Sequence, residues 1–382
     1  MLRVSSDSIA RRIVRTCMRV RPGEVIMLSG GVHNFELVED LAVNIRRAGA
    51  FPVITVTSDR LTHRLVSELD VNTLREVPSY LLRWLDEVNG IIDVDGSRDP
   101  RCLQDLPEDR VSACRAGLEA IHRKRAERSI RWLWIGYPTR EKAQLYGIDF
   151  EKLHDGFWRA LDVDYEAMAA AGSALVEAIG TGRAVRVRSD QGTDLEFTLL
   201  GRTARVDDGV ISDEDLAQGF VTNNLPCGEV FYAPVESSVN GRAVFDLAYY
   251  RGHPIRGIDV TFSEGRLVRA RAAENETLFL DRLRNATGGA DRVGEFGIGL
   301  NPSLRAPTGD TSIDEKIWGS VHLALGDNLS FGGQNSSNLH WDLLIMRPTV
   351  EVDGRLLIKD GELLPLSPPR LRHRRRAGAG AR

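Results

Sequence analysis

The sequence predicts an α/β N-terminal domain, with a parallel sheet covered by helices on both faces, followed by a β-rich α+β domain. Two observations carry this prediction. Over roughly the first 150 residues, short apolar runs alternate with segments of helical periodicity, a pattern typical of right-handed βαβ units. From Ala184 onward, short strand-like segments separated by turn residues dominate instead.

The first half begins with a helix in which Ile9, Ile13 and Cys17 recur at helical spacing. Strands are predicted at 25–28, 52–56, 90–94 and 131–135, with helices at 35–45 and around 104–127. The Gly30-Gly31 pair lacks a G-x-G-x-x-G pattern, which favours an ordinary strand-to-helix turn over a nucleotide-binding loop. A helix over 162–180 is expected to close this domain, because Gly180-Thr181-Gly182 ends it.

The second half is predicted to be mostly β. Strands are expected at 184–189, 193–200, 230–233, 242–245, 257–262 and 266–272, and helical insertions at 275–286 and 313–325. We therefore expect an α/β domain over residues 1–180 and a β-rich metal-binding domain over 181–366. The arginine-rich segment 367–382 has little apolar surface to bury, and this composition predicts a basic, disordered tail.

Composition excludes several classes of protein. The net charge of −4 and the pI of about 6.1 give no overall field that would attract nucleic acid or a membrane surface. No apolar run approaches the roughly 20 residues that span a bilayer, and arginines interrupt the N-terminal apolar runs, unlike a signal peptide. Four scattered cysteines without a C-x-x-C pair fit a reducing compartment. We expect a cytoplasmic protein.

The segment Asn338-Leu339-His340-Trp341-Asp342 holds the first candidate site residues. If it forms a strand, as the apolar run after it indicates, His340 and Asp342 project from one face. Imidazole nitrogen and carboxylate oxygen are common ligands of divalent metals. An H-x-D pattern also occurs often by chance, so on its own it is weak evidence for a metal site.

Three further residues strengthen this prediction. Glu229 and Glu295 lie in apolar, glycine-containing runs, where a glutamate either points to solvent from a strand edge or is buried and needs a cation partner. His322 lies in the apolar segment 318–326, where it is either a core histidine or a ligand. Together with His340 and Asp342, they form a plausible set of ligands for two divalent ions that activate a bridging water.

With these residues in hand, the chain resembles the thermophilic metalloaminopeptidase family of aminopeptidases T and S. The matching segments are NLPCGEVFYAPVESSVNG (224–241), GEFGIGLNP (294–302), VHLALG (321–326) and NLHWD (338–342). The resemblance covers roughly residues 5–360. It implies that Glu229, Glu295, His322, His340 and Asp342 bind two divalent ions (zinc, cobalt or manganese), with Glu295 as general base. It also implies hydrolysis of the N-terminal residue of peptides, and a homodimer.

One departure from the family leaves other reactions open. Leu329 stands where the family usually has a tyrosine thought to help catalysis. The related 2,5-dihydroxypyridine dioxygenases use one ferrous ion held by two histidines and an aspartate. A ring-cleaving dioxygenase acting on a small hydroxylated aromatic is therefore the alternative to an aminopeptidase. A family member recruited to another small-molecule reaction is the third hypothesis.

Overall fold

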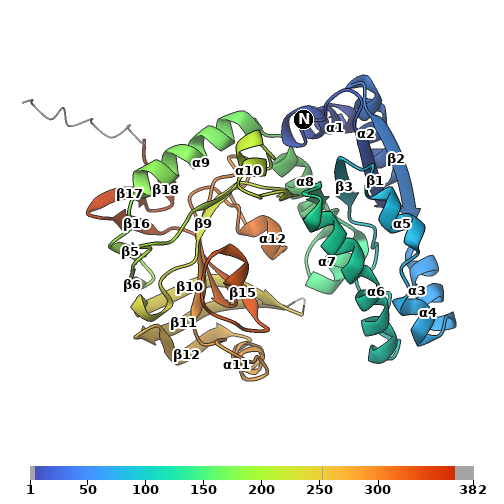
Figure 1. The fold of residues 1–382 in the computed structure, drawn as a ribbon. Helices are drawn as coiled ribbons and strands as arrows, with labels where there is room; N and C mark the ends of the chain where they lie inside the picture. Colours follow the sequence, from blue (N-terminus) through green and yellow to red (C-terminus); the bar gives the residue numbers. More distant parts are fainter. Residues whose placement is uncertain (1–4, 252, 366–382) are drawn as a thin grey trace, which may run out of the picture.

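The computed structural model describes residues 5–251 and 253–365. Two sheets organise the chain, a five-stranded parallel sheet and a large antiparallel sheet of 13 strands (Figure 1). This arrangement confirms the predicted fold class. Within the described residues, no helix is both long and apolar enough to cross a membrane.

The parallel sheet has the order β2-β1-β3-β4-β8. Its strands are β1 (Val25–Gly31), β2 (Phe51–Thr57), β3 (Gly90–Val94), β4 (Arg131–Ile135) and β8 (Thr222–Leu225). The helical segments of the first half are α1 (Ser6–Arg12), the π-helical turn η1 (Ile13–Cys17), α2 (Phe35–Arg47), α3 (Asp59–Glu68), α4 (Val71–Arg75), α5 (Ser79–Trp84), α6 (Glu108–Glu127), α7 (Arg140–Tyr146) and α8 (Phe150–Leu161).

Helices cover both faces of this sheet, as the sequence predicts. Ile26 and Leu28 of β1 point to one face and pack in the same core as α1 and α2. Val25 and Met27, which alternate with them, pack on the other face against the cluster that contains Leu85. Because neighbouring residues of a strand point to opposite faces, a strand buried on both faces is apolar without interruption.

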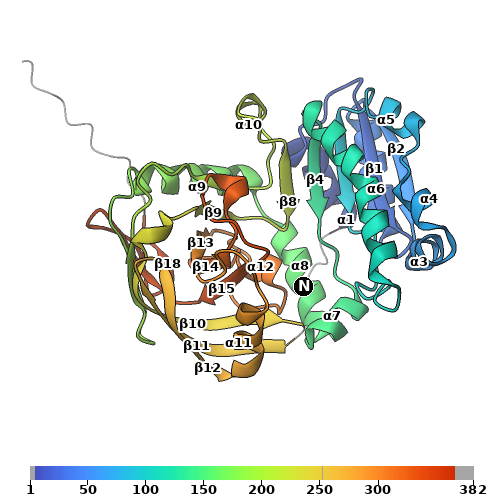
Figure 2. The same ribbon diagram turned by 60° about the horizontal axis from the view of Figure 1, so that its bottom comes forward.

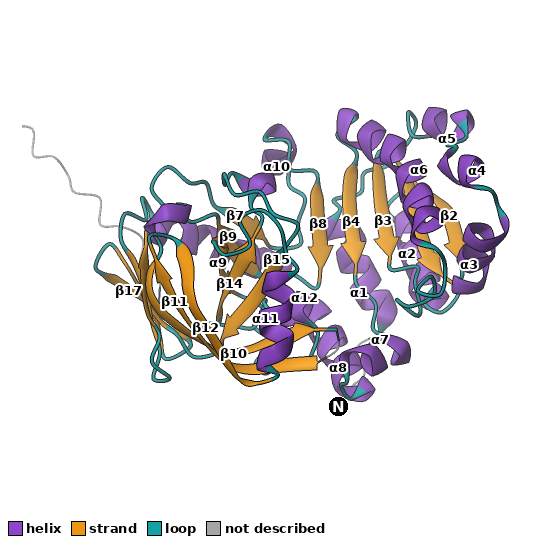
Figure 3. Cartoon of the chain, turned by 90° about the horizontal axis from the view of Figure 1, so that it is seen from below, coloured by secondary structure: helices purple, strands orange, loops and turns teal. Residues whose placement is uncertain are grey.

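Strand β8 departs from the expected division of the chain. It follows residue 181 in sequence, where a β-rich domain was expected to begin, yet it pairs in parallel with β4 through Thr222 and Trp132. Figures 2 and 3 show it at the edge of the first sheet, on the side that faces the second. Residues 222–225 therefore belong with the parallel sheet. Four residues without a marked pattern gave no sequence signal for this return.

The antiparallel sheet has the order β18-β17-β16-β5-β6-β10-β15-β14-β13-β9-β7, and the hairpin of β11 and β12 extends it from β10. Its strands are β5 (Val185–Arg188), β6 (Asp194–Phe197), β7 (Arg205–Asp207), β9 (Glu229–Tyr232), β10 (Asn240–Tyr250), β11 (His253–Ser263), β12 (Arg266–Glu274), β13 (Val293–Gly299), β14 (Val321–Gly326), β15 (His340–Ile345), β16 (Thr349–Val352), β17 (Arg355–Lys359) and β18 (Glu362–Leu363). The helical segments are α9 (Tyr165–Ile179), α10 (Asp213–Ala217), η2 (Glu236–Ser238), α11 (Glu276–Arg284), α12 (Thr311–Asp314) and η3 (Leu329–Phe331).

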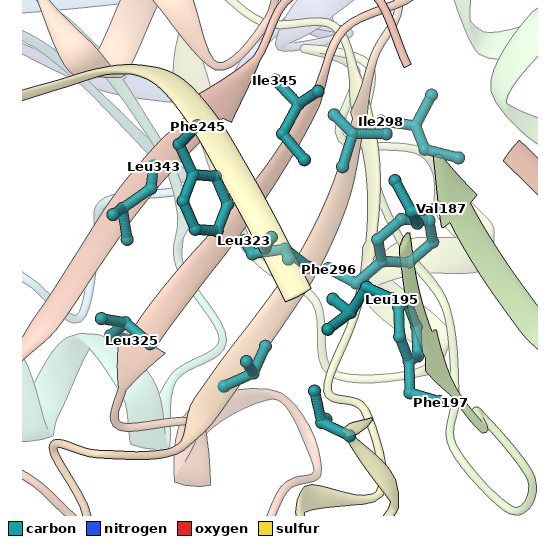
Figure 4. Packing of buried hydrophobic residues seen from close by; sticks show 14 of the residues in the cluster. Val187, Leu195, Phe197, Phe245, Phe296, Ile298, Leu323, Leu325, Leu343 and Ile345 are labelled. Carbon is teal, nitrogen blue, oxygen red and sulfur yellow. The ribbon is translucent and has the colours of Figure 1, made fainter. Parts of the chain in front are cut away.

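One face of this sheet closes on a single apolar core. Phe296, Leu323 and Leu343, from three adjacent strands, lie in it together with Phe197 and Phe245 (Figure 4). Helix α9 contributes Leu175 and Ile179 to the same core, which confirms the helix predicted over 162–180. The core fixes the sheet, so the residues alternating with these core side chains present a rigid opposite face.

The helix predicted over 313–325 is wrong. Helix α12 ends at Asp314, and Val321–Gly326 form strand β14, which is buried along its whole length between β13 and β15. A short apolar run buried on both faces has no periodicity that separates a strand from a helix. The helix predicted over 275–286 is confirmed as α11. The basic tail predicted at 367–382 lies outside the described residues.

Candidate metal centre

The candidate ligands lie on one face of four adjacent strands, β9, β13, β14 and β15. Residues directly opposite each other on antiparallel strands point to the same side of the sheet. The opposing pairs are Glu229 with Gly299, His322 with Gly297, Glu295 and Asp342 each with Ala324, and His340 with Gly326. All five predicted site residues therefore share the face opposite the apolar core, and the structure brings them together.

Small residues between the ligands give this face its hollow shape. A Cβ atom on Gly297 would lie 2.1 Å from the Cε1 and Nε2 atoms of His322, so the imidazole ring occupies the space above this glycine. Ala324 separates Glu295 from Asp342 and has only a methyl group. The motif GEFGIGL thus places an acid and two glycines at alternate positions, a site feature that the sequence analysis did not use.

Glu295 lies at the centre of the cluster. Its Oε1 atom is 3.0 Å from Nε2 of His322, which is 3.2 Å from Oε2 of Glu229. Its Oε2 atom is 3.4 Å from Nε2 of His340, which is 3.7 Å from Oδ1 of Asp342. The ligand atoms form two groups, Glu229–Glu295–His322 and Glu295–His340–Asp342, and within each group all ligand atoms lie within 4.8 Å of one another. Glu295 belongs to both.

The protonation of the two histidines follows from their surroundings. The Nδ1 atom of His340 lies 2.9 Å from the backbone oxygen of Asp327. With Nδ1 donating a proton there, Nε2 is the nitrogen of His340 that would bind a metal ion held between the neighbouring carboxylates. Burial by itself lowers the pKa of His322. The hydrogen bond to Glu295 and the charges of Glu229 and Asp342 outweigh burial and raise this pKa to about 10.

The carboxylates of the cluster lack enough partners. Glu229 and Asp342 are buried, and burial raises the pKa of both. Oε2 of Glu229 and Oδ1 of Asp342 accept no hydrogen bond from any described residue. A buried carboxylate oxygen without a donor is costly, and a divalent cation is the partner that carboxylate and imidazole ligands share. The residues present thus fit a metal ion at each of the two groups.

Three charged residues of the site were missed by the sequence analysis. Lys316 is 1% exposed. Its Nζ atom lies 2.5 Å from Oε1 of Glu229, 2.7 Å from Oε1 of Glu315 and 3.1 Å from Oδ2 of Asp207. Burial lowers the pKa of Lys316, but the three carboxylates raise it well above its usual value, so the ammonium stays charged. Lys316 lies within the segment predicted to be helical, where nothing marked it as buried.

Comparison with known proteins agrees with this geometry. The model of the thermophilic metalloprotease (M29) family matches residues 5–366. The chain belongs to this family. It is therefore a metal-dependent hydrolase by family, and the resemblance seen in its motifs is confirmed.

Relatives of this M29 protein are distant but match over nearly the whole chain. Aminopeptidase PepS of Streptococcus thermophilus is 25% identical over 409 residues, covering 94% of this chain and 96% of PepS. Wild-type AmpT from Thermus thermophilus superposes with a TM-score of 0.70 at 21% identity, covering 94% of this chain and 99% of AmpT. The 2,5-dihydroxypyridine dioxygenase of Pseudomonas putida KT2440 gives a TM-score of 0.62 at 15% identity, covering 94% and 98%. The two structures share the fold.

The M29 site opens into a large cleft between the two sheets. The cleft has a volume of about 1720 Å³, and its lining includes Glu229, Glu295, His340 and Asp342. Trp134 at the end of β4 lines the side that the parallel sheet contributes. This volume exceeds the range of roughly 300–1,000 Å³ typical of small-ligand pockets, so the cleft has room for a peptide.

Leu329, which replaces the family tyrosine, lies beside the cleft and not among the residues that line it. Its side chain is 54% exposed. Phe331, two residues later, lines the cleft instead, and its ring stands perpendicular to that of His340 with 6.0 Å between ring centres. In this M29 chain the turn after β14 therefore presents an aromatic ring, and not a phenol, to the metal ligands.

Proposed function

We propose that this protein is a dinuclear metal-dependent aminopeptidase that removes the N-terminal residue of peptides. The observation that carries the proposal is the position of Glu295. Its two carboxylate oxygens face two different groups of ligands, one with Glu229 and His322 and one with His340 and Asp342. A carboxylate between two such groups would be shared by two metal ions, as expected of a two-metal hydrolase.

The charges of the site also favour two ions. The site and its surroundings hold one ammonium group, that of Lys316, which contacts three carboxylates. With the two acids farther along the cluster there are five carboxylates, namely Asp207, Glu229, Glu295, Glu315 and Asp342. With neutral histidines, four negative charges remain, which is the charge that two divalent cations neutralise. One ferrous ion would leave two charges uncompensated in a site where burial makes charge costly.

The chain's own residues divide the work of hydrolysis. Bound divalent ions supply a water of lowered pKa and polarise the scissile carbonyl. Glu295 would take a proton from the attacking water on one carboxylate oxygen, while its other oxygen stays with its ligand group, and would return the proton to the leaving amine nitrogen. Lys316 holds Oε1 of Glu229 in place, and the backbone oxygen of Asp327 orients His340. Glu229 and His340 are thus each held by a neighbour outside the ligand set.

The decisive experiment replaces Glu295 by Gln and measures hydrolysis of unblocked peptides after zinc, cobalt or manganese has been added. We expect kcat to fall about 10²–10⁴-fold, the usual contribution of a general base, while the thermal unfolding temperature changes little. Wild-type protein should hold two ions per chain by elemental analysis. Full activity in the Gln variant, or an N-terminally acetylated peptide cleaved as well as the free one, would contradict the proposal.

A mononuclear iron dioxygenase is the second candidate, because the site has two histidines and an aspartate and the fold is shared with such an enzyme. The geometry favours it less. Each of the two compact ligand groups among the described residues contains one histidine, so His322 and His340 do not converge with Asp342 on one point. Anaerobic addition of ferrous ion followed by a dihydroxypyridine tests this alternative. Oxygen uptake at a rate above that of free iron would support the dioxygenase hypothesis.

A homodimer and a cytoplasmic location remain predictions from the sequence, as does the absence of nucleic-acid and membrane partners. Sedimentation equilibrium across a range of protein concentrations tests the dimer. A single species with the mass of one chain, 42.4 kDa, would contradict it.

A further inference from the structure

Arg205 lies on the same face of the sheet as the metal ligands. It belongs to β7, the last strand of the sheet, which pairs with β9. Asp207 is opposite Glu229 in this pair, and Arg205 is opposite Phe231. Side chains two residues apart on a strand point to one side, about 7 Å apart. Arg205 therefore projects into the metal-site face, one side-chain position away from Glu229.

The guanidinium of Arg205 has no acidic partner within residues 5–251 and 253–365. Its contact is with an aromatic ring, since its Cζ atom lies 3.5 Å from the ring centre of Phe220. Burial, with no nearby carboxylate to oppose it, lowers the pKa of Arg205. The neighbouring Arg202 shows the usual arrangement, because its guanidinium pairs with Glu236. Arg205 is half-buried and stacked, yet its N–H donors have no acceptor among the residues that the structure describes.

These donors face the substrate cleft. Arg205 and Phe220 both line the cavity that contains Glu229 and Glu295. A planar guanidinium with fixed donors matches a carboxylate, which it binds through two parallel hydrogen bonds. Stacking on Phe220 fixes the plane of the guanidinium, so little side-chain freedom remains to be lost when a carboxylate binds. The cleft thus offers an anion site at a set distance from the metal centre.

We propose that Arg205 binds a carboxylate of the substrate, and that this contact selects short peptides with a free C-terminus. An extended chain spans about 3.3–3.6 Å per residue. A peptide of two or three residues whose N-terminal residue lies at the metal centre therefore reaches Arg205 with its terminal carboxylate. The inference depends on the proposed aminopeptidase activity and names the substrate class of the same site.

Matched peptides test the contact. Leu-Gly-Gly and its C-terminal amide differ by the carboxylate alone, and Leu-Glu-amide moves the carboxylate to a side chain. For wild-type protein we expect kcat/KM to be about 10–100-fold higher for the free acid than for the amide, the range for a hydrogen bond to a charged group. If kcat/KM for Leu-Glu-amide is as high as for the free acid, Arg205 binds an acidic side chain of the substrate. If it is as low as for Leu-Gly-Gly-amide, Arg205 binds the C-terminal carboxylate.

The variant Arg205→Met should lose this preference. We expect its kcat/KM for the free acid to fall about 10–100-fold, mainly through KM, and to change less than about threefold for the amide. Arg205→Lys keeps the positive charge but not the two parallel N–H donors, so its kcat/KM for the free acid should lie between the values of the wild type and of Arg205→Met. Arg15→Met is the matched control, because Arg15 is an exposed arginine lining the same cleft. It should affect acid and amide alike.

Two results would overturn the inference. One is equal kcat/KM of wild-type protein for acid and amide, and the other is an equal loss for both in Arg205→Met. Binding of each peptide to chelator-treated protein, which hydrolyses neither, measured by calorimetry, separates this inference from the proposed function. If the free acid binds more tightly than the amide, and this difference is lost in the Arg205→Met variant, the carboxylate site is supported even if no peptide is hydrolysed. Equal binding of both peptides rejects it.

Discussion

Lys316 shows how much of the site depends on one residue that coordinates nothing. Its ammonium is enclosed with Glu229, Glu315 and Asp207. Removing one member of a buried charge network costs about 3–5 kcal/mol, because the remaining charges stay buried without a partner. We expect Lys316→Met to lower the free energy of unfolding of the metal-free protein by that amount in denaturant titrations. Lys359→Met, at an exposed position, should change it by less than about 0.5 kcal/mol.

Gly297 makes a second prediction at the scale of one residue. Its missing side chain leaves the space that the His322 ring fills, 2.1 Å from where a Cβ would lie. Gly297→Ala should therefore displace the imidazole and weaken metal binding about 10–100-fold, the effect usual for residues that orient a ligand. Competition with a chelator of known affinity measures this. Gly90→Ala lies in the parallel sheet, and its added Cβ would meet the flexible end of Met18 and Cδ1 of Ile26, so it should leave metal affinity unchanged.

The residues of the site differ in how visible they are in the sequence. Glu229, Glu295, His322, His340 and Asp342 stand in motifs that resemble a known family, and the structure gathers all five. Lys316 and Asp207 carry no such mark, because a lysine and an aspartate in a polar stretch are normally exposed. They become buried only because β7, which contains Asp207, and the segment after α12, which contains Lys316, both pack beside Glu229 of β9. Arg205 was missed for the same reason.

At the scale of elements, the turn after β14 positions the aromatic wall of the site. Asn328 donates a hydrogen bond to Glu236, and the backbone N–H of Gln334 donates to the same carboxylate. These bonds hold η3 so that Phe331 meets His340 while Leu329 points to solvent. We expect Phe331→Ala to lower kcat/KM about tenfold, since aromatic contacts contribute about 0.5–1.5 kcal/mol each and Phe331 also contacts Phe231. Leu329→Ala should lower it less than twofold, and the opposite order would show that Leu329 faces the substrate.

The elements also show where sequence patterns are sufficient. Strands β1, β3 and β4 were predicted because they are short, continuous apolar runs. Helices α2 and α9 were predicted because their apolar residues recur at the spacing of one helix face. Strand β14 was not, because an apolar run such as Val321–Leu325 fits a buried helix as well as a central strand. The pairing of β8 with β4 was also missed. It joins segments about 90 residues apart, a contact that no local pattern contains.

At the scale of the whole molecule, the cleft between the two sheets contains a cluster of acids whose charge Lys316 balances only in part, so stability and metal binding should both depend on pH. The pKa of His322 is raised to about 10, and those of Glu229, Asp342 and Lys316 are raised as well. The folded metal-free protein therefore binds more protons than the unfolded chain. Its stability should be fullest below the unfolded pKa values and fall as pH rises.

We expect the denaturant midpoint of chelator-treated protein to fall between pH 6.5 and 10, the interval between the unfolded and folded pKa of His322. Metal-loaded protein should not show this fall, because a ligated imidazole is already neutral. Loading must then release protons, and calorimetric heats at pH 7 should differ between buffers of different ionisation enthalpy. His322→Gln protein should release fewer protons. A metal-free protein whose stability stays constant or rises over this interval would show that the fold does not raise the pKa of His322.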